Sequence, residues 1–204
     1  MTPGPARRTR NARGEGARLR TELLAAASRL LAGGDPAAVT LRAVAREAGV
    51  AAPSVYGHFP DLDALLLAVV EQHLAELRAA FDAAVAGPGH AEERLRAGAL
   101  EYCEWGLRHP GAYAVVFGGR AVRLLTEAEA VAFEDGEAML DSLGALVARL
   151  PGVAAADVAG LRLAAWTGVH GVVSLRSGKP GYPWPPLADH VTAVLTGVLP
   201  RGGG

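Results

Sequence analysis

Hydrophobic residues recur at a helical spacing through most of this 204-residue chain, and glycine and proline interrupt the pattern at intervals. In the first such segment, Leu19, Leu23 and Leu30 fall on one face of a helix. Alanine, the residue with the highest helix propensity, makes up about a fifth of the chain. Because no segment has a convincing strand pattern, the sequence predicts an all-α fold of about nine helices.

Caps and breakers set the expected ends of these helices. Thr40 and Asp61 are suitable N-caps, and Thr126 with Glu129 would form a capping box. Gly49 breaks the chain between two short helical segments. We expect helices at about 18–31, 41–48, 52–58, 62–85, 91–108, 127–149, 154–177 and 187–199, with a short segment at 112–117.

Several classes of protein are excluded by what the sequence lacks. Cys103 is the single cysteine, so no intrachain disulfide, paired redox cysteines or cysteine zinc cluster can form. The histidines have no metal-binding spacing, and no phosphate-binding glycine loop or nucleophile elbow occurs, so we expect no metal, no cofactor and no catalysis. The N-terminus lacks the apolar stretch of a signal peptide, and no run of about 18 apolar residues occurs, so we expect a cytoplasmic protein without membrane contact.

The formal net charge of −1 hides an uneven distribution of charge along the chain. The first 60 residues carry nine arginines and four acidic residues, a net of +5, and the remainder carries a net of −6. Four of the arginines lie in residues 1–17, which we predict to be a flexible basic arm. A basic end on an acidic body favours DNA binding by one module, although a solvated surface with an unstructured tail would give the same counts.

The stretch from Leu41 to His58 has the pattern of a helix-turn-helix. Two short helical segments meet at Gly49, which tolerates the positive φ that such a turn needs. Ala45 is small where the two helices approach, and apolar residues stand where the helices must touch each other and their supporting helix: Val44, Ala48, Val50 and Val55. A generic pair of helices is the alternative, but this spacing favours a DNA-binding motif.

Residues 40–66, TLRAVAREAGVAAPSVYGHFPDLDALL, resemble the N-terminal domain of the TetR (tetracycline-repressor) family of transcriptional regulators. With the preceding helix, the resemblance covers about residues 18–66. Further along, Trp166 with His170-Gly171 resembles the Trp…His-Gly signature of one class of TetR C-terminal domain, and His109-Pro110…Tyr113…Phe117 is similar to that class. The resemblance implies a helix-turn-helix DNA-binding domain at 18–62 and a helical ligand-binding and dimerisation domain at 63–200.

The resemblance also implies a DNA-contacting role for each matching position. Residues 52–58 would be the recognition helix in the major groove. Thr40, Tyr56 and His58 match positions that hold phosphates, and their side chains are suitable donors. The positions that contact base edges are Ala51, Ala52, Pro53, Ser54 and Gly57.

Two features depart from the family pattern. Leu62 stands where the family usually has a phosphate-binding lysine, so Arg42, Arg46 or the arm would have to replace that contact. The base-reading positions are also short of polar side chains. We therefore expect contacts to thymine methyl groups and a contribution from DNA shape, including arginines of the arm in the minor groove.

The segment from Leu161 to Leu175 carries only one formal charge, at Arg162, and is apolar nearly all round. Such a helix should be covered on two sides, which predicts a four-helix bundle between two subunits together with the last helix. A fully internal helix in a monomer is the alternative. The candidate interface residues are Leu161, Gly168, Val172, Leu175, Val191, Val194, Leu195 and Val198.

The body holds most of the aromatic residues, and the resemblance implies that it encloses a ligand cavity. For each residue singly, ordinary core packing remains the alternative. The cavity candidates are Tyr102, Cys103, Gly106, Phe117, Phe133, Met139, Trp166 and His170.

The sequence therefore predicts a sequence-specific DNA-binding transcriptional regulator. We expect a homodimeric repressor that binds a near-palindromic operator in double-stranded DNA and that a small-molecule ligand releases. The alternative is a helical small-molecule-binding protein or enzyme in which the N-terminal motif is only structural.

Overall fold

The computed structural model describes residues 15–33, 36–117 and 136–200, and the regular structure in these ranges is entirely helical. The predicted all-α class is thereby confirmed, with nine α-helices in the described ranges when the helical residues 136–147 are counted. The remaining helices are α1 (Glu15–Leu31), α2 (Leu41–Glu47), α3 (Ala52–Tyr56), α4 (Leu62–Ala86), α5 (Ala91–Arg108), α6 (Pro110–Phe117), α8 (Val158–Gly178) and α9 (Leu187–Val198).

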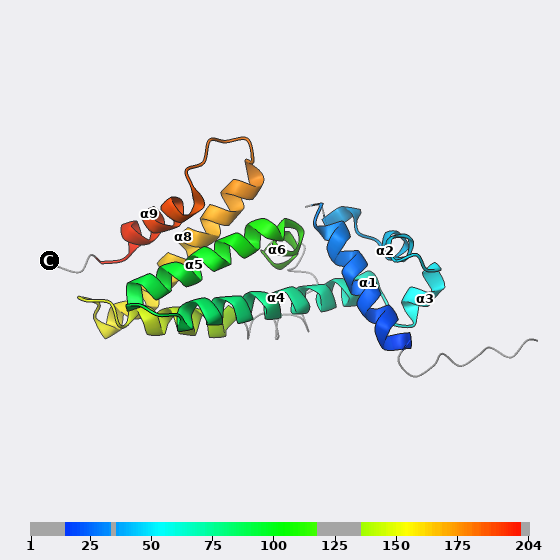
Figure 1. The fold of residues 1–204 in the computed structure, drawn as a ribbon, viewed down its shortest axis with the longest axis horizontal. Coiled ribbons are helices and arrows are strands. Elements are labelled where there is room, and N and C mark those ends of the chain that lie inside the picture. The colour runs from blue at the N-terminus through cyan, green and yellow to red at the C-terminus, as the bar shows by residue number, and fades with distance from the viewer. Residues whose placement is uncertain (1–14, 34–35, 118–135, 201–204) are drawn as a thin grey trace, which may run out of the picture.

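Helices α1, α2 and α3 form a small head at one end of an elongated molecule, on the right of Figure 1. Their apolar faces meet the first turns of α4 in a shared core, in which Val44, Val55 and Leu65 are fully buried. Val44 and Val55 lie where the helix-turn-helix pattern predicted buried contacts, whereas Leu65 was not predicted. The head is therefore a three-helix unit braced by the start of α4.

Helix α4 runs from the head along the length of the body (Figure 1). It begins at Asp61, whose carboxylate accepts a hydrogen bond from the backbone N–H of Ala64 at 2.8 Å, as expected of an N-cap. The helix is 25 residues long. It packs against α1 in the head and against α5 and α6 in the body. Because one continuous helix belongs to both parts, any tilt of α4 is carried into the head.

The body is built around α5, which packs against α4, α8 and α9. Small residues allow its close contacts. A Cβ atom on Gly106 would lie 2.7 Å from Cγ1 of Val173, and one on Gly98 would lie 2.6 Å from Cγ1 of Val85. Side chains larger than glycine would therefore push α8 or α4 away from α5.

Helix α6 connects the body to the head. Its second residue, Gly111, lies against the backbone of Leu31, where α1 ends, and has no room for a Cβ atom. At its other end, Val116 and Phe117 face the interior of the body. The two ends of this short helix thus contact two different parts of the protein.

Some element ends differ from the expected ones. The recognition helix, expected at 52–58, ends at Tyr56 because Gly57 and the following His58-Phe59-Pro60 segment turn the chain towards α4. Helix α6 begins at Pro110, which fits the first position of a helix because proline needs no hydrogen-bonded N–H there. The chain from Ala155 to Asp157 forms a 3-10 turn before α8. Thr126, Glu129 and the first part of the helix expected at 127–149 lie outside the described residues.

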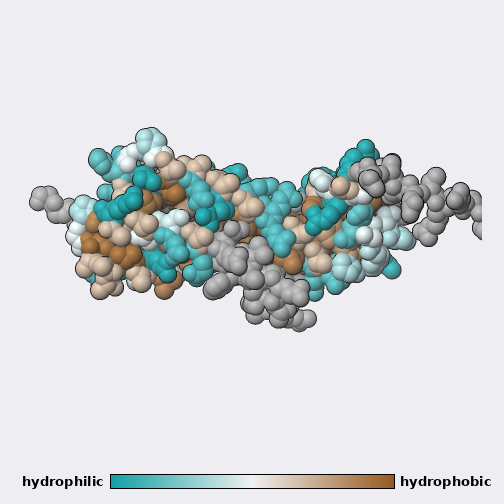
Figure 2. Space-filling view, turned by 90° about the horizontal axis from the view of Figure 1, so that it is seen from below, coloured by the Kyte–Doolittle hydropathy of each residue, from teal (hydrophilic) through white to brown (hydrophobic). Residues whose placement is uncertain are grey.

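The helical stretch Ala155–Gly178 has a mean hydropathy of 1.2 over an 18-residue window, so by length and composition it could cross a membrane. Its surroundings give another explanation for this composition. The helix packs on α5 and α9, and Arg162 within it pairs with Asp141 at 2.7 Å. Figure 2 shows that hydrophobic surface gathers on the body at the end away from the head.

Candidate DNA-binding surface and body cavity

The local geometry of α2, the turn and α3 follows from three residues. The Thr40 hydroxyl accepts a hydrogen bond from the backbone N–H of Ala43 at 3.1 Å and so caps α2. Gly49 has φ +70°, the left-handed conformation that favours glycine, and allows the turn. Pro53 lies in the first turn of α3, where a missing N–H is tolerated. The Thr40 cap and the turn at Gly49 were predicted from the sequence.

The residues proposed to contact DNA lie together on the outer side of α2 and α3. Tyr56 projects into solvent with 59% of its surface exposed, and Ala52 and His58 are half-buried. The Cε1 atom of His58 lies 3.8 Å from the Cβ position of Gly16, so the start of α1 covers part of its ring. The others are exposed: Thr40, Arg42, Ala51, Pro53, Ser54 and Gly57.

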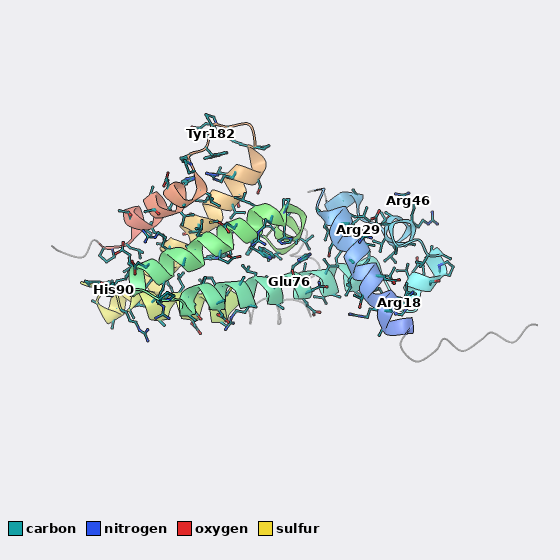
Figure 3. All side chains as sticks on the ribbon, in the orientation of Figure 1. Arg18, Arg29, Arg46, Glu76, His90 and Tyr182 are labelled. Carbon is teal, nitrogen blue, oxygen red and sulfur yellow. The ribbon has the colours of Figure 1, made fainter. Side chains whose placement is uncertain are left out.

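Arginines surround this surface on the head. Arg42 and Arg46 are exposed and make no ion pair with any described residue. Arg29 instead pairs with Glu47 at 2.7 Å, which links α1 to α2. Figure 3 shows Arg18, Arg29 and Arg46 on the head, well away from Tyr182 at the far loop of the body. Free guanidinium groups beside an exposed helix are suited to hold a phosphate backbone.

The side chain of Leu62 is not fully presented to solvent beside the recognition helix. It is half-buried and packs against the core at the start of α4. Arg20 of α1 lies over the ring of Phe59 in the same region, with its guanidinium carbon 5.2 Å from the ring centre. The apolar side chain at position 62 thus serves packing, and the cationic groups of the head come from α1 and α2.

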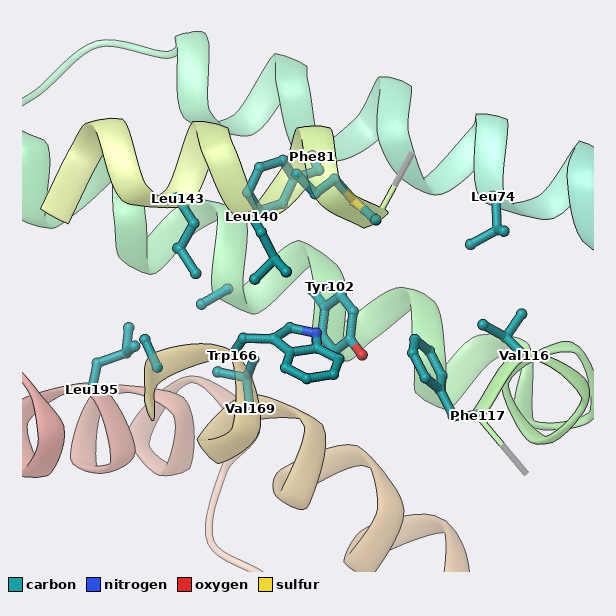
Figure 4. Close-up of a pocket in the computed structure, with 14 residues that line it drawn as sticks. Leu74, Phe81, Tyr102, Val116, Phe117, Leu140, Leu143, Trp166, Val169 and Leu195 are labelled. Carbon is teal, nitrogen blue, oxygen red and sulfur yellow. The ribbon is translucent and has the colours of Figure 1, made fainter. Parts of the chain in front are cut away.

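A cavity lies inside the body between α4, α5, α6, α8, α9 and the helical residues 136–147 (Figure 4). The cavity has a volume of about 100 Å³. None of its lining residues among the described ranges is charged. Its walls are formed chiefly by Leu74, Phe81, Val116, Leu140, Leu143 and Leu195.

A cluster of polar aromatic side chains borders this cavity. The Tyr113 hydroxyl lies 2.6 Å from Nδ1 of His170, and the Tyr102 hydroxyl lies 3.4 Å from both of these groups. Burial raises the pKa of Tyr102 strongly, with a further contribution from Tyr113, and burial also raises the pKa of Tyr113. Burial lowers the pKa of His170. The three side chains therefore form an uncharged hydrogen-bonding group at neutral pH.

The structure brings together only part of the predicted cavity set. Tyr102, Phe117, Met139 and Trp166 line the cavity. His170 stands behind them and stacks on Tyr113, with ring centroids 5.4 Å apart. Phe133 lies outside the described residues.

Two further candidates pack away from the cavity. Cys103 is fully buried, its thiol lies 3.6 Å from the carbonyl of Val169, and burial raises its pKa to about 12. Such a thiol stays protonated and is a poor nucleophile. Gly106 is enclosed by Val173 and Tyr113.

Sequence reasoning missed several residues of the cavity. It also missed Tyr113, which does not line the cavity but belongs to the polar cluster beside it. Tyr113 lies four positions before Phe117, so the helical period could have placed both on one face of α6. The lining leucines of α4 and of residues 136–147 carry no such signal. They have the same apolar period as any core residue, and only the packing of distant helices brings them to one space.

The predicted dimer residues fall into two groups. Val172, Val191 and Leu195 are buried inside the protomer, and Leu195 lines the cavity. A Cβ atom on Gly168 would lie 2.5 Å from Cγ1 of Val194, so these two residues pack together within one chain. Leu161 and Val198 are half-buried, and Leu175 is 51% exposed. Leu163, which the sequence analysis did not select, is 52% exposed on α8.

No three histidine, cysteine, aspartate or glutamate side chains gather as a metal site within the described ranges. His73 is buried, and its ring nitrogens lie 3.2 Å each from the Ser28 hydroxyl and the Glu76 carboxylate. His109 lies beside it, with ring centroids 4.9 Å apart. These contacts join α1, α4 and the end of α5.

Many solved structures have a fold similar to this one, and regulators are among them. A protein with unknown function from Rhodococcus sp. RHA1 has a TM-score of 0.73 and 29% identity, with 94% of this chain and 100% of that chain covered. The TetR family transcriptional regulator PfmR from Thermus thermophilus has a TM-score of 0.70 at 18% identity, covering 88% and 99%. FadR from Bacillus subtilis in complex with stearoyl-CoA has a TM-score of 0.68 at 15% identity, covering 88% and 97%.

Comparison with protein-family profiles assigns both parts of the chain. Residues 23–69 match the profile of bacterial regulatory proteins of the tetR family. Residues 95–199, half of the chain, match a tetracyclin repressor-like C-terminal domain. No curated protein sequence matches the chain significantly. The exposed helix-turn-helix, the helical body and these two matches agree, and the chain belongs to the TetR family of DNA-binding, ligand-responsive transcriptional regulators.

Proposed function

We propose that the protein acts as a homodimeric repressor that binds a near-palindromic operator and leaves it when a small molecule enters the body. The observation that carries this proposal is the exposed outer side of α3, with Tyr56 projecting from it and unpaired arginines beside it within the described residues. A recognition helix needs such a surface, because both the phosphates and the base edges must reach it.

The DNA contacts that we propose are of two kinds, contacts to phosphates and contacts to bases. Thr40, Tyr56 and His58 hold phosphates together with Arg42, and Arg46 or the arm at residues 1–17 supplies the charge that Leu62 lacks. Ala51, Ala52 and Pro53 touch thymine methyl groups, and Ser54 and Gly57 approach base edges. Few polar groups then read the bases directly, so a substantial part of the sequence preference comes from DNA shape.

The proposed dimer forms through the outer face of α8. Of the residues in the most apolar stretch of this helix, only 22% are buried within one protomer. Leu163 and Leu175 are about half exposed. Gly171 has no neighbour within 4 Å of its Cβ position and leaves room for a partner helix. The hydroxyl of Thr167 donates to the carbonyl of Leu163 at 2.9 Å, so this hydroxyl needs no partner across the interface. Leu163→Glu should give a monomer in analytical ultracentrifugation, and Ala79→Glu, at an exposed position of α4, serves as a control outside that face.

Ligand occupancy reaches the head through α6 in this proposal. Val116 and Phe117 line the cavity at one end of α6, and Gly111 touches Leu31 of α1 at the other. A ligand that displaces α6 therefore moves α1 and, through it, the recognition helix. A repressor results if the ligand binds more tightly to the arrangement whose two heads no longer match the operator.

We further propose that the chain is organised as an arm and two domains. The arm was expected at residues 1–17, but α1 already begins at Glu15, so residues 15–17 belong to the head and residues 1–14 lie outside the described residues. The DNA-binding domain comprises residues 18–62 together with this first turn of α1, and the ligand-binding and dimerisation domain comprises residues 63–200. The protein works in the cytoplasm, where its operator is, and has no catalytic role. Helix α4 crosses the boundary at residue 62, so the two domains move as parts connected by one helix.

Selection from a library of random DNA duplexes tests the proposed function. The full-length protein should enrich a short inverted repeat, and its affinity should fall steeply as salt is raised. Arg42→Ala should weaken binding to the enriched duplex, whereas Arg149→Ala, an exposed arginine of the body, should not. Failure to enrich any duplex would overturn the proposal.

A further inference from the structure

The body cavity has one polar end and otherwise apolar walls. Among its described lining residues, only Tyr102 and Trp166 carry a hydrogen-bonding N–H or O–H group, and none carries a charge. Figure 4 shows the Tyr102 hydroxyl between Trp166 and Phe117, within the space that the leucines enclose. The cavity volume of about 100 Å³ is much larger than the space that one water molecule needs. Water in such a space would find few hydrogen-bond partners, so an apolar molecule fits it better.

The Tyr102 hydroxyl has spare hydrogen-bonding capacity. The side chain is only 5% exposed, and the Tyr113 hydroxyl and Nδ1 of His170 both lie 3.4 Å from its oxygen, near the limit of hydrogen bonding. The indole N–H of Trp166 also bonds to this oxygen, but it can only donate and so does not use the Tyr102 proton. The short bond of the cluster, 2.6 Å, joins Tyr113 to His170 instead. With neutral His170 accepting from Tyr113, the proton of Tyr102 is held by weak contacts alone. An acceptor atom of a ligand at normal distance would form a better bond.

The absence of charge along the described lining restricts the ligand further. A carboxylate, phosphate or ammonium group inside the cavity would lose its hydration without gaining an ionic partner. Tyr102 and Tyr113 stay protonated because burial raises their pKa values, and burial keeps His170 neutral by lowering its pKa. The cluster can therefore donate a neutral hydrogen bond but cannot compensate an ionised group.

We propose that the cavity binds a neutral, mainly apolar small molecule that carries one hydrogen-bond acceptor, such as a ketone or ester carbonyl, which the Tyr102 hydroxyl holds. This inference rests on the proposed function, since it names the class of ligand that would release the repressor. Phe117 and Trp166 flank the acceptor, and the leucines of α4 and residues 136–147 cover the apolar remainder.

Three probes of equal chain length separate this ligand class from others: 2-nonanone, nonanoate and 1-nonene. Binding is followed by tryptophan fluorescence of the full-length protein at pH 7.5, because Trp166 lines the cavity. We expect 2-nonanone to bind at least about tenfold more tightly than nonanoate, since the carboxylate must be desolvated. Trp166→Phe should remove the ketone-induced change in fluorescence, which locates the probe in the cavity.

Tyr102→Phe tests the hydroxyl itself. It should weaken 2-nonanone binding by roughly three- to tenfold, the usual effect of one neutral hydrogen bond, and leave 1-nonene binding unchanged. Tyr182→Phe is the matched control, because Tyr182 is 57% exposed in the loop between α8 and α9, away from the cavity. The helical circular dichroism signal and melting temperature of each variant check folding. Should Tyr102→Phe misfold, the comparison of ketone with carboxylate in the wild-type protein still decides the proposal.

Equal or tighter binding of nonanoate would overturn the inference and indicate a chain whose charged end stays outside the cavity. No detectable binding of 2-nonanone, or an unchanged affinity in a folded Tyr102→Phe variant, would also overturn it. Each result is obtained without DNA. Retention of salt-dependent operator binding by the same samples would then leave the proposed function standing while the ligand class fails.

Discussion

Gly111 of α6 lies directly against the backbone of Leu31, the residue at which α1 ends. This contact joins the first turn of a body helix to the helix that supports the DNA-binding motif. Because α6 ends at the cavity with Val116 and Phe117, we propose that a ligand in the body changes the spacing between α6 and α1. The contact is a physical route between the two proposed sites.

Replacing Gly111 with alanine tests this route. The added methyl group would overlap the carbonyl of Leu31, so α6 and α1 must separate at a cost of about 1–3 kcal/mol in unfolding free energy. We expect weaker operator binding with ligand binding in the cavity retained. Gly181→Ala is the control, since Gly181 is exposed in the loop between α8 and α9 and its Cβ position has no neighbour within 4 Å. Urea denaturation and DNA titration measure both effects, and full DNA affinity in Gly111→Ala would contradict the route.

The turn between α2 and α3 gives a second prediction. Gly49 has open space around its Cβ position but φ +70°, so Gly49→Ala should cost about 1–2 kcal/mol through backbone strain alone. Gly57, with φ −70° and ordinary contacts, should tolerate alanine with little loss of stability. Unfolding in urea compares the two variants. A loss of similar size at both positions would show that strain at Gly49 is not the cause.

Thr40 and Asp61 both cap helices in the head, but only Thr40 is proposed to touch DNA. Alanine at either position should lower the unfolding free energy by about 1 kcal/mol, because each side chain accepts a hydrogen bond from a helix N–H. Thr40→Ala should also weaken operator binding, and Thr40→Ser should restore it. Asp61→Ala should not weaken DNA binding, since it removes a negative charge from the head. Equal DNA affinities for Thr40→Ala and wild type would remove Thr40 from the phosphate contacts.

Tyr56→Phe isolates one hydroxyl on the recognition helix. The side chain is 59% exposed to solvent, so stability should not change. Operator affinity should fall by roughly three- to tenfold if this hydroxyl holds a phosphate. Fluorescence anisotropy with the selected duplex measures the change in affinity, and Tyr182→Phe is the control in the body. Unchanged affinity would exclude a role for the hydroxyl.

The half-buried His109 and His170 should make the free energy of unfolding depend on pH. Burial lowers the pKa of His109, with further contributions from His73 and Arg108, and burial lowers the pKa of His170. The unfolded chain therefore binds protons at a higher pH than the native protein. Stability should decrease as pH falls below about 6.5, the ordinary histidine pKa. The double variant His109→Gln/His170→Gln should show a flatter pH profile in thermal unfolding, and an unchanged profile would assign the pH dependence to other groups.

The sequence predicted the parts of the fold that local rules control. The caps at Thr40 and Asp61, the positive φ of Gly49 and the buried faces at Val44 and Val55 each depend on a few neighbouring residues. The cavity depends instead on how distant helices pack. Leu195 looked like an interface residue because its helix is amphipathic, yet it lines the cavity, and Gly168 contacts Val194 of its own chain. Periodicity gives the buried side of a helix but not which neighbour covers it.

The basic head is the part of the molecule that we propose to hold DNA. The most direct measurement is the salt dependence of affinity for the selected duplex, compared between wild type and the Arg42→Ala/Arg46→Ala variant. We predict a linear fall of log K with log salt in the wild type, and a slope reduced by roughly one for each phosphate that the variant no longer neutralises. Binding that is independent of salt, or an identical slope in the variant, would contradict DNA binding by the head.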